Sequence, residues 1–295
     1  MMDEDTIVFW HRGNSWYLKT ALEQAAKYNR NIVLLGDDKN SNIWNTFYNM
    51  DKLSDKKYWE FRRVYKNLSM NDEVFELRCF ERYFYVFEYC KQMKLDRIIL
   101  CDSDLMIYQN LTQYFAGKNR AFSHTLSEPE GMSISPHCSL WMIGDLEKFT
   151  NYLIDYYHTK VRHLEKIYEE YKITHSKGGI CDMTLLWLYL NDNRLTYFNT
   201  AVVRGNSAIV DHAISVSDNG TKNEYIMSKL TGCKVVFFKD GIPYFRTKMT
   251  NKDVPVVALH CSGGYKNYMS IFSMEKYNVF RIFIRRVCCK IIGKM

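Results

Sequence analysis

The sequence predicts an α/β fold with a doubly wound sheet in a single large domain. The chain opens with the order strand, helix, strand over residues 7–35, which is typical of such sheets. A later run, residues 97–101, is apolar without polar alternation, as expected for a strand that is covered on both faces. A hydrophobic content of 47% supports a sizeable core, and only 4 Pro and 14 Gly argue against modules joined by linkers.

The individual elements follow from apolar spacing. Residues 7–10 and 31–35 are short apolar runs typical of strands, and residues 17–26 place apolar side chains at helical spacing. No G-x-G-x-x-G follows the first strand, so a nucleotide would be bound without the dinucleotide fingerprint. The remaining expected elements are a helix over 73–93, strands over 97–101 and 138–143, helices over 145–171 and 180–190, a hairpin over 234–246 and a strand over 254–259.

Cysteine usage and the N-terminus favour a cytoplasmic protein. The nine cysteines are an odd number and form no C-x-x-C pair, so we expect reduced thiols rather than a disulfide framework or a zinc site. The acidic N-terminal residues run directly into the first strand, without the basic and apolar regions of a secretory signal. No apolar stretch approaches the length that spans a bilayer.

The net charge of +7 is concentrated in the C-terminal tail. Residues 275–295 contain six Lys or Arg against one Glu, a net of +5, which leaves +2 for the rest of the chain. The apolar residues of the tail fall on one helical stripe: Phe280, Phe283, Ile284, Val287, Cys288, Ile291 and Ile292. We therefore expect residues 271–295 to form a basic amphipathic helix that binds an anionic membrane surface. The alternative is a terminal helix packed on the domain; the nearly neutral body argues against a nucleic-acid partner.

A candidate metal site lies at the end of the apolar strand over 97–101. Asp102-Ser103-Asp104 follows this strand directly, at the sheet edge where open α/β proteins bind ligands. Residues two apart in extended chain point the same way, so both carboxylates can bind one hard divalent cation. The alternative is that Asp102 caps the next segment and Asp104 is only solvated.

A second candidate segment follows the strand over 254–259. It contains His260, Gly263 and Lys266 in the spacing His-x-x-Gly-x-x-Lys. A neutral imidazole is a good ligand for Mn²⁺, glycine allows the backbone to approach an anion, and lysine supplies a charge for a diphosphate. The segment therefore combines a metal ligand with a phosphate-binding loop.

Together these motifs resemble those of GT-A-fold, metal-dependent glycosyltransferases, most closely the retaining family 8 galactosyltransferases of bacterial lipooligosaccharide synthesis and related capsule-locus sugar transferases. The resemblance spans about residues 6–270 and implies a GT-A (Rossmann-like) domain with a mixed central sheet over residues 1–270. It implies that Asp102, Asp104 and His260 bind Mn²⁺ or Mg²⁺. It also implies catalytic roles for Arg82, with Arg78 as second choice on the same helix, and for Lys266. The residues assigned to binding of the nucleotide-sugar donor are His11, Asp37, Arg82, Asp102, Ser103, Gly263 and Lys266.

The chain departs from this family at three places. The family's Asp-Gln-Asp-like segment retains a single carboxylate, Asp182, which is the third catalytic candidate as a ligand of donor sugar or acceptor. The family's Pro-Trp after the lysine is replaced by Asn267-Tyr268. Asp211-His212 is expected either to line the acceptor site or to form a surface turn. The loss of the glutamine of the Asp-Gln-Asp-like segment weakens the retaining assignment, although retention is still expected over inversion.

The expected function is transfer of a sugar from a nucleotide diphosphate, UDP-hexose above all, to a saccharide or glycolipid acceptor in lipopolysaccharide or capsule synthesis. We expect a peripheral protein on the inner face of the cytoplasmic membrane. Two alternatives stay open. A phosphatase of the haloacid-dehalogenase type also uses Asp-x-Asp, but on its first strand with Thr or Val two residues later, where this chain has Met106. A non-catalytic protein that binds nucleotide sugar or glycan would also fit the motifs.

Overall fold

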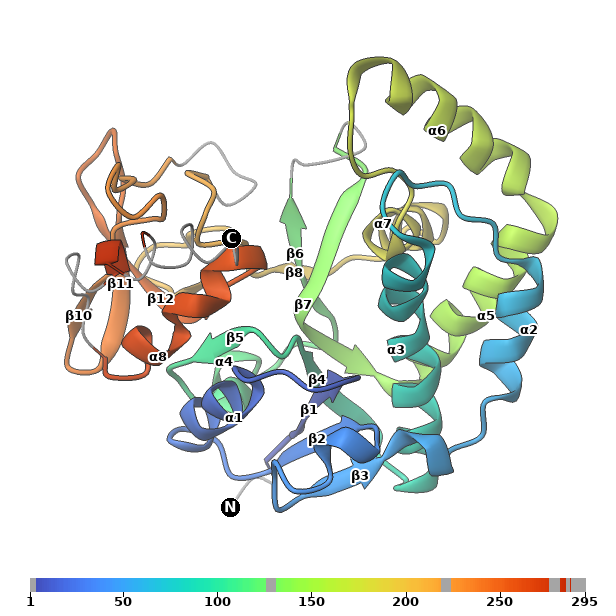
Figure 1. Ribbon diagram of the computed structural model, residues 1–295, viewed down its shortest axis with the longest axis horizontal. Helices are drawn as coiled ribbons and strands as arrows, with labels where there is room; N and C mark the ends of the chain where they lie inside the picture. Colours follow the sequence, from blue (N-terminus) through green and yellow to red (C-terminus); the bar gives the residue numbers. More distant parts are fainter. Residues whose placement is uncertain (1–3, 126–130, 219–223, 276–281, 285–286, 288–295) are drawn as a thin grey trace.

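The computed structural model describes residues 4–125, 131–218, 224–275, 282–284 and 287, and they fold around two sheets (Figure 1). The larger sheet has, in spatial order, the strands β3 (Phe47–Asn49), β2 (Ile32–Gly36), β1 (Thr6–His11), β4 (Arg97–Cys101), β7 (Ser133–Met142), β6 (Ala121–Thr125) and β8 (Phe198–Asn199). Strands β1 to β4 run parallel, whereas β7 is antiparallel to both β4 and β6. The predicted α/β class with a mixed central sheet is therefore confirmed.

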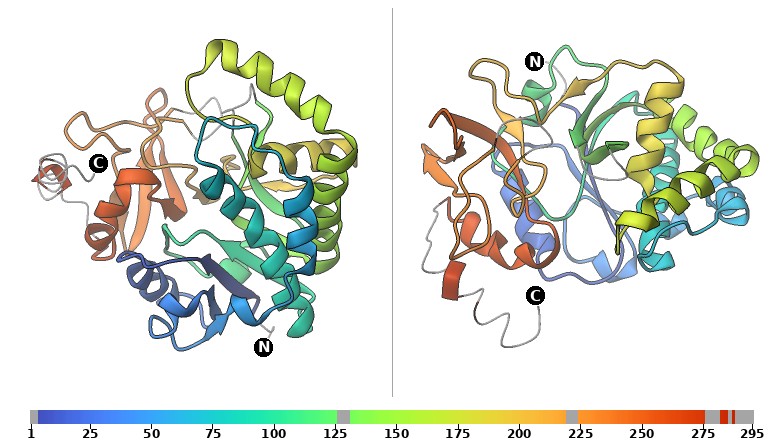
Figure 2. Two further views of the ribbon diagram at one scale, coloured as in Figure 1. Left: turned by 45° about the vertical axis from the view of Figure 1, so that its right-hand side comes forward. Right: turned by 90° about the horizontal axis from the view of Figure 1, so that it is seen from above.

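Strand β4 is buried on both faces, as its apolar sequence predicts. Ile98 and Leu100 pack into one hydrophobic cluster, while Ile99 and Cys101 pack into another on the opposite face. Helices cover the first of these faces, and Figure 2 shows them grouped on one side of the larger sheet. They are α2 (Lys56–Val64), α3 (Glu73–Gln92), α5 (Ile143–Thr159), α6 (Val161–Thr174) and α7 (Asp182–Asp192).

The other face of the larger sheet packs against α1, α8 and a second, smaller sheet. The second sheet contains β10 (Phe237–Lys239), β11 (Ile242–Arg246), β12 (Asp253–His260) and β5 (Leu105–Ile107), with β9 (Ile209–Val210) beside β12. The remaining elements are α1 (Leu18–Ala26), η1 (Asp38–Asn40), η2 (Met50–Lys52), α4 (Leu111–Tyr114), η3 (Gly263–Tyr268) and α8 (Met269–Phe272).

The chain passes directly from the larger sheet into the second sheet at the two aspartates. The chain leaves β4, passes through Asp102-Ser103-Asp104 and at once forms β5, which pairs antiparallel with β12 so that Leu105 lies opposite His260. The backbone N–H of Cys261 also donates to the Asp104 carbonyl at 3.0 Å. This pairing places the His260 segment next to the two aspartates, although the segments are far apart in the sequence.

Three predicted elements differ from the structure. The helix predicted over 145–171 is two helices, α5 and α6, because Lys160 adopts a non-helical backbone conformation (φ −123°, ψ 18°). The strand predicted over 138–143 begins earlier, at Ser133, and the helix predicted over 180–190 begins at Asp182. The seven cysteines in the described part of the chain are free thiols.

The C-terminal tail lies largely outside the described residues. The predicted boundary at residue 270 falls within α8, whose Phe272 is buried in the core, so the packed body continues beyond it. Of the tail, Ile282 is buried against the core, whereas Phe283, Ile284 and Val287 of the predicted apolar stripe are 38–45% exposed. No helix in the described ranges has both the length and the apolar character to cross a bilayer.

Candidate active site

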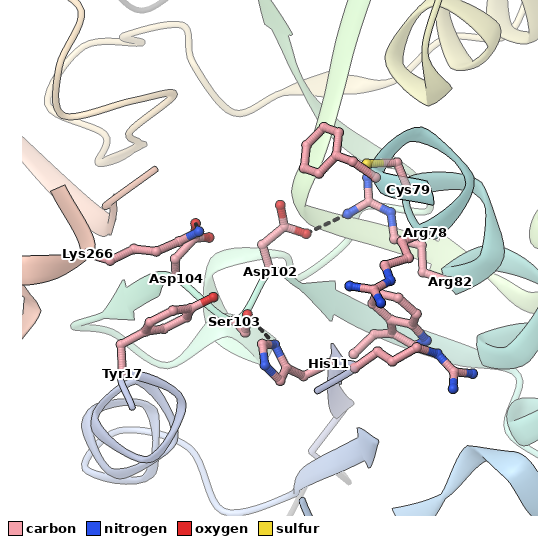
Figure 3. A pocket seen from close by; sticks show the side chains of 12 residues that line it. His11, Tyr17, Arg78, Cys79, Arg82, Asp102, Ser103, Asp104 and Lys266 are labelled. Carbon is pink, nitrogen blue, oxygen red and sulfur yellow. Dashed lines mark hydrogen bonds and ion pairs between the residues drawn. The ribbon is translucent and has the colours of Figure 1, made fainter. Parts of the chain in front are cut away.

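A pocket of about 230 Å³ lies where β1 and β4 end, beside α3 and the loop after β12 (Figure 3). Its lining residues come from four segments that are distant in the sequence: Trp10, His11, Arg12, Tyr17, Phe75, Arg78, Cys79, Arg82, Asp102, Ser103, Asp104 and Lys266. Figure 3 shows Asp102 near the centre, with Lys266 and Asp104 on one side and Arg82 on the other. The pocket is therefore at the ligand-binding edge that the sequence predicts.

Asp102, Asp104 and His260 form a compact cluster of metal-ligand side chains. One ligand atom from each residue lies within 4.8 Å of the others. Asp102 and Asp104 extend from the end of β4, and His260 is the last residue of β12. The structure therefore brings together the three residues assigned to the metal.

The chemistry of this donor set fits a divalent cation. Two carboxylates and one imidazole suit Mn²⁺, and Mg²⁺ can also use the carboxylates. The Nδ1 atom of His260 is hydrogen-bonded to the carbonyl of His212, and a carbonyl can only accept, so Nδ1 carries the proton. The other ring nitrogen, Nε2, faces Asp104 at 3.3 Å and is left as the metal-binding atom. Metal-binding histidines are commonly oriented in this way.

Without a metal, cationic side chains surround Asp104. The Nζ atom of Lys266 and the Nε2 atom of His260 each lie 3.3 Å from its carboxylate. Burial alone would raise the pKa of Asp104, but the charges of His260 and Lys266 hold it well below its usual value. Burial would lower the pKa of His260, but Asp104 and Asp102 raise it to about 9. Positive charge is therefore stabilised where the metal would bind.

Arg82 links the metal cluster to α7. Its guanidinium donates to Asp102 at 2.5 Å and to Asp182, and the Tyr83 hydroxyl donates to Asp182 at 2.8 Å. Burial raises the pKa of Asp102, and the charge of Arg82 opposes this rise. Asp182 is only 3% exposed and does not line the described pocket. In the structure Asp182 therefore contacts Arg82, and its predicted contact with the donor sugar or the acceptor stays a prediction.

The other residues assigned to the donor divide into two groups. His11 and Ser103 line the pocket and are hydrogen-bonded through His11 Nδ1 and the Ser103 hydroxyl at 2.9 Å. Burial lowers the pKa of His11 to about 4, so its ring is neutral at pH 7. Asp37 instead accepts the backbone N–H of Gly13 at 2.7 Å and caps η1. Gly263 opens η3 with φ +60°, a conformation that favours glycine, and it does not line the described pocket.

Several pocket side chains carry buried N–H groups without an acceptor. Among the described residues, no hydrogen-bond partner is found for Trp10 Nε1, Arg12 Nε or Arg82 Nε. A buried donor without a partner is unfavourable and uncommon in folded proteins. These three donors suit a ligand that is rich in acceptor oxygens, such as a diphosphate or a sugar.

Asp211 is buried, so it does not lie in the surface turn that was one predicted alternative, whereas a role of Asp211-His212 at the acceptor site stays a prediction. Asp211 is fully buried, and one of its carboxylate oxygens accepts from the equally buried Lys234 at 2.5 Å. The other oxygen accepts from the backbone N–H of His260 at 3.2 Å. The buried carboxylate of Asp211 and the backbone carbonyl of the partly exposed His212 therefore both hold His260.

His137, which lies on β7 beside His260, was not predicted from the sequence. A signal for it exists in the sequence, because polar residues alternate along this otherwise apolar strand at Ser133, Ser135, His137 and Ser139. All four are buried, with at most 4% exposure. Polar side chains on a buried face need hydrogen-bond partners, so the pattern indicates a polar network behind the site.

Comparison with known proteins shows similarity in structure only. No family model matches the chain, and no curated protein matches it in sequence. Among solved structures, mouse xyloside xylosyltransferase 1 matches with a TM-score of 0.48 and 11% identity over 71% of this chain and 86% of its own. The galactosyltransferase LgtC, as an active-site mutant, matches with a TM-score of 0.37 and 15% identity over 62% of this chain and 70% of its own. The bifunctional glycosyltransferase WbbM matches with a TM-score of 0.38 and 9% identity over 74% of this chain and 41% of its own.

Proposed function

We propose that this protein is a metal-dependent glycosyltransferase that uses a UDP-hexose as donor and a saccharide or glycolipid as acceptor. The observation that carries the proposal is the convergence of Asp102, Asp104, His260 and Lys266 from two sheets beside one pocket. Two carboxylates and an imidazole suit Mn²⁺, and the adjoining lysine and unpartnered N–H donors suit a diphosphate. Both parts of a metal–nucleotide complex therefore have partners in the same place.

The proposed chemistry follows from the charge that develops on the leaving group. When the bond between the sugar and the diphosphate breaks, negative charge grows on the diphosphate oxygen. Lys266, at the pocket edge, stabilises that charge, and Arg82 stabilises both Asp102 and the adjoining phosphate. A bound divalent cation supplies Lewis-acid stabilisation of the same oxygens.

The positions of the candidate bases favour retention of configuration. An inverting enzyme needs a general base near the acceptor hydroxyl, and the sequence offered Asp182 and Asp211 for that role. Asp182 is hydrogen-bonded to Arg82 and Tyr83, and Asp211 is fully buried against Lys234. Neither carboxylate faces the described pocket. In same-face attack the leaving diphosphate oxygen takes the acceptor proton, so no protein base is needed.

We also propose that the tail holds the protein at an anionic membrane, where a glycolipid acceptor in lipopolysaccharide or capsule synthesis would be presented. Three described residues of its apolar stripe, Phe283, Ile284 and Val287, are exposed, while the off-stripe Ile282 contacts the core. The tail also carries six basic residues. An exposed apolar stripe with basic neighbours suits the interface of a negatively charged bilayer.

The experiment that tests the function is a turnover screen of nucleotide sugars. Full-length protein is incubated with UDP-, GDP- and CMP-sugars, with Mn²⁺ or with chelator, and release of the nucleotide is followed by chromatography. We expect slow hydrolysis of one UDP-hexose with Mn²⁺, loss of this activity in chelator, and loss in Asp104→Asn. Binding of the nucleotide sugar without any turnover, even with a panel of glycan acceptors, would favour the non-catalytic alternative. Release of phosphate from monoesters would favour the phosphatase.

A further inference from the structure

The candidate metal ligand His260 is stacked face to face on a second buried imidazole, His137. The two ring centroids lie 4.6 Å apart, with an angle of 7° between the ring planes. His137 is on β7 of the larger sheet and is 1% exposed, whereas His260 ends β12 of the second sheet. The stack therefore connects the two sheets directly behind the metal cluster.

Both rings are oriented by two consecutive carbonyl groups. His137 Nε2 lies 2.9 Å from the carbonyl of Asp211, and His260 Nδ1 is hydrogen-bonded to the carbonyl of His212. Since carbonyls only accept, each of these ring nitrogens carries the proton. His137 Nδ1 then accepts from the Ser135 hydroxyl at 2.6 Å. Every hydrogen-bonding atom of the His137 ring is thus used to fix its plane, and that plane is the surface on which His260 lies.

The residues around this stack also hold the backbone of both metal-binding segments. The carbonyl of His137 accepts the backbone N–H of Asp102 at 2.8 Å. The carboxylate of Asp211 accepts the backbone N–H of His260 at 3.2 Å and is held by Lys234. With both backbones fixed, rotation of the His260 ring is restricted by its hydrogen bond to the His212 carbonyl and by the flat face of His137.

We propose that His137 is a positioning residue for the metal site: it holds the His260 ring in the orientation that presents Nε2 to the metal. This inference rests on the metal site of the proposed function and extends it to a residue that touches neither substrate nor metal. Groups that orient a metal ligand in this way typically change metal affinity by about 10–100-fold when removed. Loss of the His137 ring should therefore weaken metal binding without opening the pocket.

The test measures Mn²⁺ binding to the nucleotide-free, full-length protein by the electron paramagnetic resonance signal of free Mn²⁺. His137→Gln removes the stacked ring and should raise the Kd for Mn²⁺ by about 10-fold or more. His137→Phe keeps a flat ring but loses both hydrogen bonds, so its Kd should lie between those of wild type and His137→Gln. The matched control is His124→Gln on the neighbouring strand β6, a half-buried histidine hydrogen-bonded to Tyr197 at 3.0 Å, which should leave the Kd unchanged.

The possible results distinguish a failure of this inference from a failure of the proposed metal site. If Asp104→Asn abolishes binding while a folded His137→Gln binds as wild type does, the inference is overturned and the metal site stands. If wild type does not bind Mn²⁺, both fall. A second measurement does not depend on a folded variant: nitrogen-15 NMR of histidine-labelled wild type loaded with Mg²⁺. We expect neutral rings with the proton on Nε2 of His137 and on Nδ1 of His260, and a proton on Nδ1 of His137 would overturn the inference.

Discussion

The affinity of the site for Mn²⁺ should depend steeply on pH because a proton occupies the position of the metal. The pKa of His260 is raised to about 9 by Asp104 and Asp102, so the folded, metal-free protein holds His260 protonated at pH 7. A metal binds only the neutral imidazole, so binding must release this proton. At pH 7 roughly one molecule in a hundred has a neutral His260, and each unit of pH up to 9 should raise the apparent affinity about tenfold.

Calorimetric titration of Mn²⁺ between pH 6.5 and 8 measures this dependence. Repeating the titration at pH 7 in buffers of different ionisation enthalpy counts the protons released, and we expect about one per metal bound. His260→Gln serves as the control, since it removes the titrating group and should bind weakly at every pH with little slope. An affinity that is tight and constant over this pH range would refute the reasoning, because it would show that the metal does not compete with the His260 proton.

Three further predictions concern Lys266, Asp182 and the tail. Lys266→Ala should lower kcat about 100-fold or more in steady-state assays, because it removes a charge that stabilises the transition state. A change confined to KM would mean that Lys266 binds only the ground-state donor. Asp182→Ala should lower the free energy of unfolding, measured by urea denaturation, by about 3 kcal/mol or more, because it removes one partner of the buried Arg82. A loss below about 1 kcal/mol would show that the Asp182–Arg82 ion pair does not stabilise the fold. Replacing Arg281, Arg285, Arg286 and Lys290 by Gln removes four of the tail's six basic residues. It should weaken co-sedimentation with anionic vesicles by about 100-fold or more and reduce its salt dependence. Unchanged sedimentation would mean that the tail is not the membrane contact.

Local apolar spacing was sufficient to predict the parallel strands β1, β2 and β4 of the larger sheet. Strand β4 was predicted with its correct bounds because Ile98-Ile99-Leu100 lacks alternation and is followed by two aspartates. Helix α3 was also predicted to within one residue, and Asp72 caps its N-terminus by accepting from the Phe75 N–H. These features depend on residues that are near one another in the sequence, which is the range over which hydrophobic periodicity carries information.

The parts that the sequence did not predict depend on contacts between distant residues. Strand β5 is only three residues long, and its pairing with β12 joins segments about 150 residues apart. No local sequence pattern therefore predicts the strand or its pairing. The break at Lys160 does not interrupt the apolar spacing of α5 and α6, so one helix was predicted where there are two. The role of Asp182 depends on its ion pair with Arg82, which only the packing of α7 against α3 creates.

The most direct test of the metal–nucleotide site is anomalous diffraction from crystals of the full-length protein soaked with Mn²⁺ and UDP. We expect one strong manganese peak bound by Asp102, Asp104 and His260 Nε2, with the diphosphate of UDP completing its coordination and contacting Lys266. A manganese peak elsewhere, or UDP bound in the pocket without metal while Lys266 remains paired with Asp104, would contradict it.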